Sequence, residues 1–126
     1  MFHVKVKIMP SKINGLGLFA DEDIPKDSKV YSINESLDLE IPIEKFNKIS
    51  ENEQQTIKHY GYFNNKKNVW YLSFDDIRFC NHSLNGNITL KENNLISTKD
   101  IKKDEEITQN YKEFETLRKE LSKSGF

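Results

Sequence analysis

The amino-acid sequence predicts one compact, mainly β domain with short helices and irregular connections. Apolar and polar residues alternate over several short stretches, which is the pattern of strands with one buried face. Turn-forming residues separate these stretches, and no internal repeat is present. With 126 residues the chain has the length of one domain, which buries roughly two-thirds of the surface of its unfolded chain. We therefore expect a single domain over residues 1–126.

The first expected strand covers residues 2–8, and Pro10 ends it. Every second position in this strand is apolar: Phe2, Val4, Val6 and Ile8. The next stretch, NGLGLFA (residues 14–20), has two glycines spaced for an unusual backbone path, and Leu16 and Leu18 continue the alternation.

The segment 42–61 has a helical character and is the only helical insert that we expect before the C-terminus. Pro42 suits the first position of a helix. Ser50 and Glu53 have the spacing of a capping box, and the polar helix that should follow contains Ile57.

Three further β regions and a C-terminal helix complete the prediction. The β regions are residues 29–33, NVWYLSF (residues 68–74) and a hairpin formed by NITLKE and NLISTKDI around Asn93 and Asn94. The helix is expected at about residues 112–123, where three apolar residues mark one face: Phe114, Leu117 and Leu121.

The composition argues against several classes of function. Lys and Arg number 19 and Asp and Glu number 20, so no strong field favours nucleic acid or an anionic membrane as a partner. Cys80 is the only cysteine, which excludes an intramolecular disulfide and a zinc site of several cysteines. The chain has no run of about 18 apolar residues and no apolar segment typical of a signal peptide. We therefore expect a cytoplasmic protein, or one of the host nucleus if the source is viral.

One stretch, RFCNHSLNGN (residues 78–87), concentrates polar groups. Asn81 and His82 place side-chain donors and acceptors on neighbouring residues. The turn formers Asn85-Gly86-Asn87 could expose backbone amides and carbonyls. Considered alone, an Asn-rich turn with a hydrogen-bonded histidine is the simpler interpretation.

Two other stretches are also candidates for a functional site. The G-x-G of NGLGLFA lets the backbone approach a ligand closely, but no helix follows, so it is not a dinucleotide fingerprint. In KKDEEITQNYKEF (residues 102–114), acidic residues at a turn precede a short apolar alternation and Tyr111. Alone, Tyr111 would be a core or edge aromatic.

In chain order, these stretches resemble the three motifs of the SET domain, the fold of many protein lysine methyltransferases. NGLGLFA resembles the family's Gly-rich element. RFCNHSLNGN matches its Arg-Phe-x-Asn-His-Ser-x-x-Pro-Asn element except at Gly86, where proline is usual. DEEITQNY matches its Gly-Glu-Glu-(Leu/Ile)-x-x-(Asp/Ser)-Tyr element, with Asp104 in place of glycine and Asn110 in place of the common acidic residue. The resemblance covers nearly the whole chain.

The resemblance implies a fold, a cofactor and a set of site residues. The fold consists of small curved β-sheets, with the C-terminal segment threaded through a loop as a pseudoknot before a C-terminal helix. The implied cofactor is S-adenosylmethionine, and the implied partner is a protein substrate that presents a lysine. The implied cofactor-binding residues are Asn14, Gly15, Leu16, Gly17, Arg78, Asn81, His82 and Phe114. For Phe114, plain packing of the C-terminal helix is an equal alternative.

The chemistry of methyl transfer explains why such residues would be needed. The lysine amine attacks a methyl carbon held by a sulfonium, so catalysis is mainly alignment and desolvation, without a metal. The amine must be neutral although its reference pKa is about 10.4, and an apolar channel favours that form. By resemblance, the catalytic residue is Tyr111, which would orient the amine and stabilise charge around the methyl group.

Two alternatives compete with this interpretation. A thiol hydrolase could use Cys80 and His82, which would share one face of a strand, but no group that would activate the thiol is evident. A SET-fold protein could also bind a partner without catalysis, since the chain departs from the motifs at Gly86 and Asn110. Because the Asn-His pair and the motif tyrosine are all present, we favour an enzyme.

The sequence does not identify the residues that line the substrate channel or the oligomeric state. Strand aromatics are usually core residues, but four of them are candidates for a lysine channel: Tyr60, Tyr62, Trp70 and Tyr71. The chain lacks the cysteine-rich zinc segment that closes this channel in many members of the family. The C-terminal helix or a second copy of the chain could take its place, so we include a homodimer among the expected partners.

Overall fold

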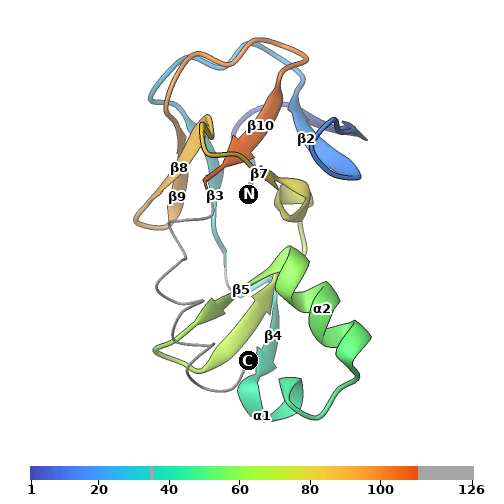
Figure 1. Cartoon of the computed structure of the whole chain (residues 1–126). Coiled ribbons are helices and arrows are strands. Elements are labelled where there is room, and N and C mark those ends of the chain that lie inside the picture. Colours follow the sequence, from blue (N-terminus) through green and yellow to red (C-terminus); the bar gives the residue numbers. More distant parts are fainter. Residues whose placement is uncertain (35, 111–126) are drawn as a thin grey trace. The chain divides into compact units, whose positions relative to one another are not determined.

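The computed structural model describes residues 1–34 and 36–110 (Figure 1). These residues form many short strands and few helices, which confirms the mainly β prediction. They group into two compact units, one of residues 1–34 with 75–110 and one of residues 36–74. The expected C-terminal helix lies outside the described residues.

The first unit contains a seven-stranded sheet. Its strands are β1 (Val6–Pro10), β2 (Leu16–Ala20), β3 (Lys29–Ser32), β7 (Asn81–His82), β8 (Ile88–Lys91), β9 (Asn94–Ser97) and β10 (Glu106–Gln109). They follow the order β1-β2-β10-β8-β9-β3, and β7 also pairs with β10. Strand β10 is antiparallel to β2 and parallel to β7 and β8 (Figure 1).

This position of β10 brings the three motifs together. Strand β2 comes from NGLGLFA, β7 from RFCNHSLNGN and β10 from DEEITQNY. In the register, Ile107 faces Leu18 of β2, whereas Thr108 faces Asn81 of β7. The third motif therefore lies between the first two, as the threaded fold requires.

The core of the first unit follows from the alternation in its strands. Leu18 and Ala20 of β2 and Ile107 of β10 are completely buried. The rest of the cluster comes from strands and connections along the unit: Ile24, Val30, Tyr31, Cys80, Ile88, Leu95 and Ile101. The removal of these apolar side chains from water contributes most of the favourable free energy that holds these short strands together.

Two expected β regions differ in detail. The first strand begins at Val6 instead of residue 2, because Phe2 pairs with Tyr31 of β3 and its ring meets the Tyr31 ring edge-on at 4.8 Å. The alternating apolar residues thus belong to two pairings: Phe2 pairs with β3, whereas Val6 and Ile8 of β1 pair with β2. The hairpin turns one residue earlier than expected, at Glu92 and Asn93, because Glu92 adopts a φ of 57° while Asn94 already belongs to β9.

The second unit consists of a three-stranded sheet and two helices. Its elements are β4 (Leu39–Pro42), α1 (Ile43–Phe46), α2 (Glu51–Tyr60), β5 (Gly61–Asn64) and β6 (Val69–Leu72), and the strand order is β4-β6-β5. The capping box is confirmed: the Ser50 hydroxyl accepts from the Glu53 amide at 3.2 Å, and Glu53 Oε1 accepts from the Ser50 amide at 3.1 Å.

Two helical predictions were wrong. Pro42 is the N-cap of α1 and not its first helical residue, because its ψ of 147° is extended and continues β4. The insert is also not the only helix before the C-terminus, because the first unit contains the 3-10 helix η1 (Asp76–Phe79). The Asp75 carboxylate caps η1 by accepting from the Asp76 amide at 2.8 Å.

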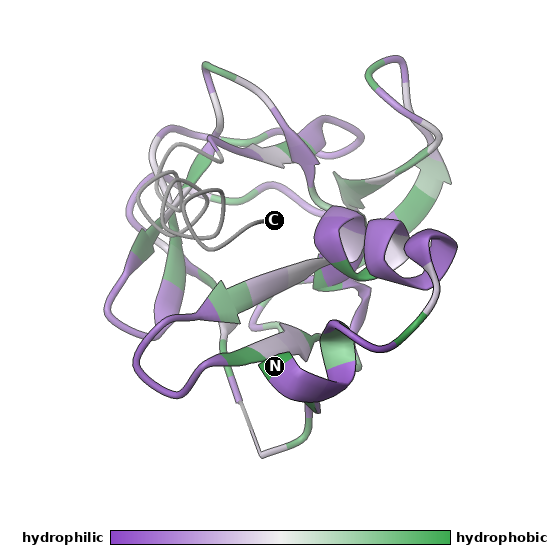
Figure 2. Ribbon diagram, turned by 60° about the horizontal axis from the view of Figure 1, so that its bottom comes forward, coloured by the Kyte–Doolittle hydropathy of each residue, from purple (hydrophilic) through white to green (hydrophobic). Residues whose placement is uncertain are grey.

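The core of the second unit is mostly aromatic. Trp70 of β6 stacks on Phe46 of α1 at 5.1 Å and lies 5.5 Å from the Phe63 ring of β5. Ile41 and Ile57 complete the cluster. Helix α2 contributes only Ile57 as a buried residue and is otherwise largely hydrophilic (Figure 2).

Candidate functional site

The Gly-rich loop, defined as residues 11–17, joins β1 to β2 and includes the first two residues of β2, and two glycines shape it. Gly15 adopts a φ of 47°, a left-handed conformation that favours glycine, and its carbonyl accepts from the Ser11 amide at 2.8 Å. A Cβ atom at Gly17 would lie 2.5 Å from Glu106 Oε2 and 2.9 Å from Ser11 Cβ. A side chain at Gly17 would therefore displace the Glu106 carboxylate of β10 or the Ser11 side chain.

The Asn81 side chain binds the backbone of this loop. Its side chain is buried, and its Nδ2 group lies 3.1 Å from the Asn14 carbonyl, 3.3 Å from the Leu16 carbonyl and 3.0 Å from Glu106 Oε2. Three acceptors around one end of the amide identify that end as the donor. Two hydrogens serve three acceptors here, so the donor capacity of Asn81 is fully used within the protein.

Glu106 joins Asn81 to the start of the loop. Its two carboxylate oxygens accept from the Ser11 hydroxyl at 2.8 and 2.9 Å. The Ser11 oxygen in turn accepts from the Ile13 amide at 2.9 Å. The sequence prediction missed Ser11 and Glu106 as site residues, although Glu106 lies inside the motif DEEITQNY.

Asn87 fixes the other side of β10. Its Nδ2 donates to the Glu106 carbonyl at 2.8 Å, and its Oδ1 accepts from the Thr108 amide at 2.8 Å. A single buried side chain thus replaces a pair of strand hydrogen bonds. Asn87 was expected in a turn that exposes backbone groups, whereas its side chain binds the backbone of β10.

Gly86 departs from the proline that is usual at this motif position, and the structure gives a local reason. A Cβ atom at Gly86 would lie 2.7 Å from the backbone nitrogen of Asn110 and 2.9 Å from Gln109 Cα. Backbone atoms cannot move aside as a flexible side chain can. The end of β10 therefore packs directly against Gly86.

Asp104 replaces the usual glycine of the third motif. Its φ is 75°, a conformation that explains a preference for glycine at this turn. The Asp104 carboxylate hydrogen-bonds the Lys7 ammonium, which lowers the pKa of Asp104 and raises the pKa of Lys7. Lys7 also lies 3.6 Å from Asp21.

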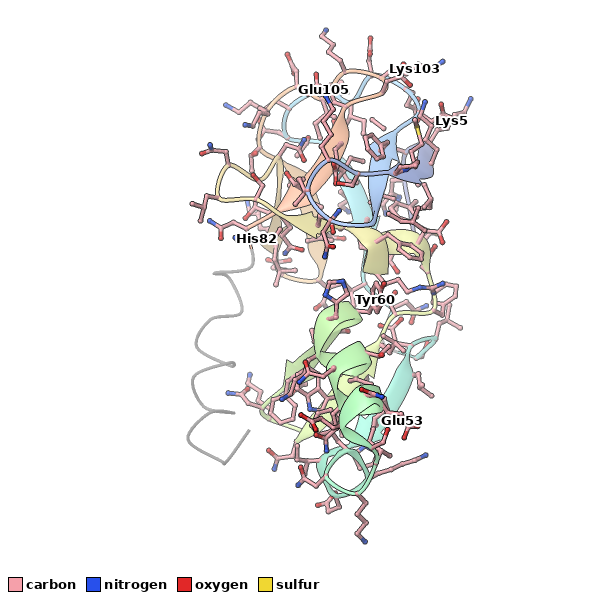
Figure 3. The ribbon with its side chains drawn as sticks, turned by 45° about the vertical axis from the view of Figure 1, so that its right-hand side comes forward. Lys5, Glu53, Tyr60, His82, Lys103 and Glu105 are labelled. Carbon is pink, nitrogen blue, oxygen red and sulfur yellow. The ribbon has the colours of Figure 1, made fainter. Side chains whose placement is uncertain are left out.

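His82 and Arg78 lie on different elements. His82 is half-buried on β7, opposite Gln109 of β10. In Figure 3 it lies away from Lys103 and Glu105, which belong to the turn before β10. Arg78 belongs to η1, and its guanidinium lies 4.9 Å from the centre of the Phe79 ring.

Cys80 behaves as a small core residue. It is buried in the cluster of the first unit, and its thiol donates to the Ile107 carbonyl at 3.5 Å. Catalytic cysteines are usually at least partly exposed, whereas this thiol is buried, so the structure does not favour a hydrolase. Tyr111 and Phe114 lie outside the described residues.

The four aromatics considered for a lysine channel belong to the second unit. Trp70 is a core residue, whereas Tyr62 and Tyr71 lie on the opposite face of the sheet and stack at 5.4 Å. Tyr60 ends α2 and is partly exposed. Their roles in a channel stay predictions.

Residues 1–34 and 36–110 contain no group of three or more side chains that could hold a metal ion. No helix in this part of the chain is long and apolar enough to cross a membrane.

The motifs and the threaded strand agree with the comparison to known protein families. A family model of the SET domain matches residues 15–112. The chain belongs to the SET domain family. No curated protein matches its sequence.

Solved structures with a similar fold include several SET domain proteins. The Polycomb Repressive Complex 2 of Chaetomium thermophilum, bound to the inhibitor GSK126, matches with a TM-score of 0.71 and 26% identity over 95% of this chain and 17% of that chain. The same complex in an autoinhibited conformation bound to S-adenosylmethionine matches with a TM-score of 0.69 and 24% identity over 96% of this chain and 17% of that chain.

A smaller neighbour has nearly the length of this SET domain. It is a candidate histone methyltransferase of Plasmodium falciparum, with a TM-score of 0.60 and 24% identity over 87% of this chain and 95% of that chain. By contrast, this SET domain spans only 14–17% of the Polycomb chains.

Proposed function

We propose that this SET domain is a protein lysine methyltransferase that uses S-adenosylmethionine. One observation carries the proposal: Asn81 of the Asn-His motif hydrogen-bonds both the Gly-rich loop and Glu106 of the third motif. Family membership supports it, and so do the neighbours, since one is bound to S-adenosylmethionine and another is a candidate histone methyltransferase.

The donor set of the described residues fits this cofactor. The Asn81 amide uses its hydrogens on loop carbonyls and Glu106, so its oxygen is left to accept from an ammonium such as that of the methionine part. The loop at residues 14–17 offers backbone close to this amide. Asn14 to Gly17, Asn81 and His82 would therefore hold the cofactor, which supplies an activated methyl group when it is bound.

The remaining task of the protein is to align a lysine. A neutral amine must approach the methyl carbon in line, so the residues around it have to exclude water and orient the nitrogen. We assign this orientation to Tyr111 on the strength of its motif position. A non-catalytic SET-fold protein that binds a partner is the alternative, and the substrate protein, a homodimer and the cellular location stay predictions.

Calorimetric titration with S-adenosylmethionine tests the proposal. We expect saturable binding that a chelator does not abolish, together with methyl transfer from labelled cofactor to lysines of a protein pool. Absence of binding by correctly folded protein would contradict the proposed function. Binding without transfer to any protein pool would favour the non-catalytic alternative.

A further inference from the structure

We propose that Glu106 is a positioning residue that sets the shape of the Gly-rich loop for the cofactor. The inference rests on the proposed function, because it names a residue that prepares the same site. Glu106 would not touch the reacting atoms. It would act through Ser11 and Asn81, which hold the two ends of the loop.

The contacts of Glu106 reach both ends of the loop. At its start, the carboxylate accepts from the Ser11 hydroxyl, whose oxygen accepts from the Ile13 amide. At its end, the carboxylate accepts from the same Asn81 amide that binds the carbonyls of Asn14 and Leu16. Through Ser11 and Asn81, the Glu106 side chain is therefore linked to both ends of the loop.

A carboxylate suits this position better than any other group. Ser11 and Asn81 both present hydrogens to it, so the group between them has to accept from two sides, and an ionised carboxylate has only acceptors. Hydrogen bonds to a charged acceptor are also stronger than neutral ones. Glutamine offers one oxygen, so its amide nitrogen would face one of the two donors.

Gly17 shows how closely the carboxylate is fitted to the loop. Its hydrogen occupies the space where a Cβ atom would lie 2.5 Å from Glu106 Oε2. The carboxylate therefore fills the space that a side chain at position 17 would otherwise occupy. Removal of Glu106 would leave both an empty space under Gly17 and two buried or half-buried donors without their acceptor.

The test compares Glu106→Ala and Glu106→Gln with Glu105→Gln. Glu105 is the matched control, because its carboxylate accepts from the Lys102 amide in the turn before β10 and forms no hydrogen bond with the loop within residues 1–34 and 36–110. S-adenosylmethionine affinity, measured by calorimetry, should fall about five- to a hundredfold in Glu106→Ala. Glu106→Gln should restore part of this loss, and the control should bind as the parent does.

Two further measurements separate positioning from general stability. In turnover assays, KM for S-adenosylmethionine should rise while kcat at saturating cofactor stays close to parental, because bound cofactor restores the loop. Misfolding would instead reduce the fraction of active enzyme, so the apparent kcat would fall while KM stayed unchanged. Without cofactor, amide hydrogen exchange should quicken in residues 11–17 of Glu106→Ala while the rest of the first unit keeps its protection.

Parental affinity in Glu106→Ala, an equal loss in Glu105→Gln, or unchanged exchange at residues 11–17 would overturn the inference. If Glu106→Ala does not fold, Ser11→Ala applies the same test, since it removes one donor of the network and should weaken binding less. If the parent binds no S-adenosylmethionine, the proposed function fails. The exchange measurement then still decides whether Glu106 holds the loop.

Discussion

At Asp104 a charged side chain takes a backbone conformation that glycine adopts more easily. The φ of 75° disfavours most L-residues, although Asp and Asn tolerate it better than others. The ion pair with Lys7 offers a compensating contact between β1 and the turn before β10. Asp104 is exposed and Lys7 is half-buried near the surface, so the contribution of this pair should be small and sensitive to salt.

Asp104→Asn tests this contact, because asparagine keeps the tolerance for positive φ and removes the charge. The lowered pKa of Asp104 means that its contribution is present above the unfolded pKa of about 3.9 and is lost as pH falls through the folded pKa. The raised pKa of Lys7 means that its contribution is present below about pH 10.4 and is lost as pH rises through the folded value.

We therefore expect the urea midpoint of Asp104→Asn to be slightly lower than that of the parent near neutral pH. The two midpoints should converge in strong acid, and also at about 1 M salt. Glu92→Gln is the matched control, because Glu92 also has a positive φ but forms no ion pair within residues 1–34 and 36–110. A difference that persists in acid would show that the effect does not come from the ion pair.

Among the elements, β10 depends on side chains as much as on strand pairing. It has only four residues. On one side it pairs with β7, which has two residues, and with β8, to which it is joined by the single pair Gln109–Ile88. Asn87 adds two hydrogen bonds to the backbone of β10. This clamp keeps the third motif beside the second.

Asn87→Ala should therefore destabilise the first unit markedly. The change leaves the Thr108 amide and the Glu106 carbonyl without their partner, at a cost of about 1–3 kcal/mol in the free energy of unfolding. Urea denaturation measures this loss. Asn85→Ala is the control, since Asn85 is exposed in the same turn and, within residues 1–34 and 36–110, forms hydrogen bonds only through its backbone. A loss below about 0.5 kcal/mol for Asn87→Ala would contradict the clamp.

The elements also show which features the sequence could predict. Local signals were sufficient for the capping box at Ser50 and for the alternation of β2. The edge strand β4 went unpredicted, since its four residues offer too few positions for a pattern. The Ser11–Glu106 contact was also missed, because the two residues are 95 positions apart and only the threading of β10 brings them together.

We expect the proposed methyl transfer to depend on Tyr111, whose catalytic role is a prediction from its position in the third motif. Tyr111→Phe deletes only the hydroxyl. Methyl transfer should fall about a hundred- to a thousandfold, as is typical for loss of one preorganised polar contact in a transition state. Cofactor affinity and the thermal midpoint should change little. Parental turnover in this variant would remove Tyr111 from the mechanism and require another residue to orient the lysine.

The buried positions of Cys80 and Trp70 make the cooperativity of this chain measurable without any mutation. The chain has one cysteine, in the core of the first unit, and one tryptophan, in the core of the second. Thiol labelling therefore reports the opening of one unit, and indole fluorescence reports the opening of the other. Coincident transitions for the two signals would mean that residues 1–126 unfold as a single cooperative body, whereas separate transitions would reveal two folding units within one SET domain.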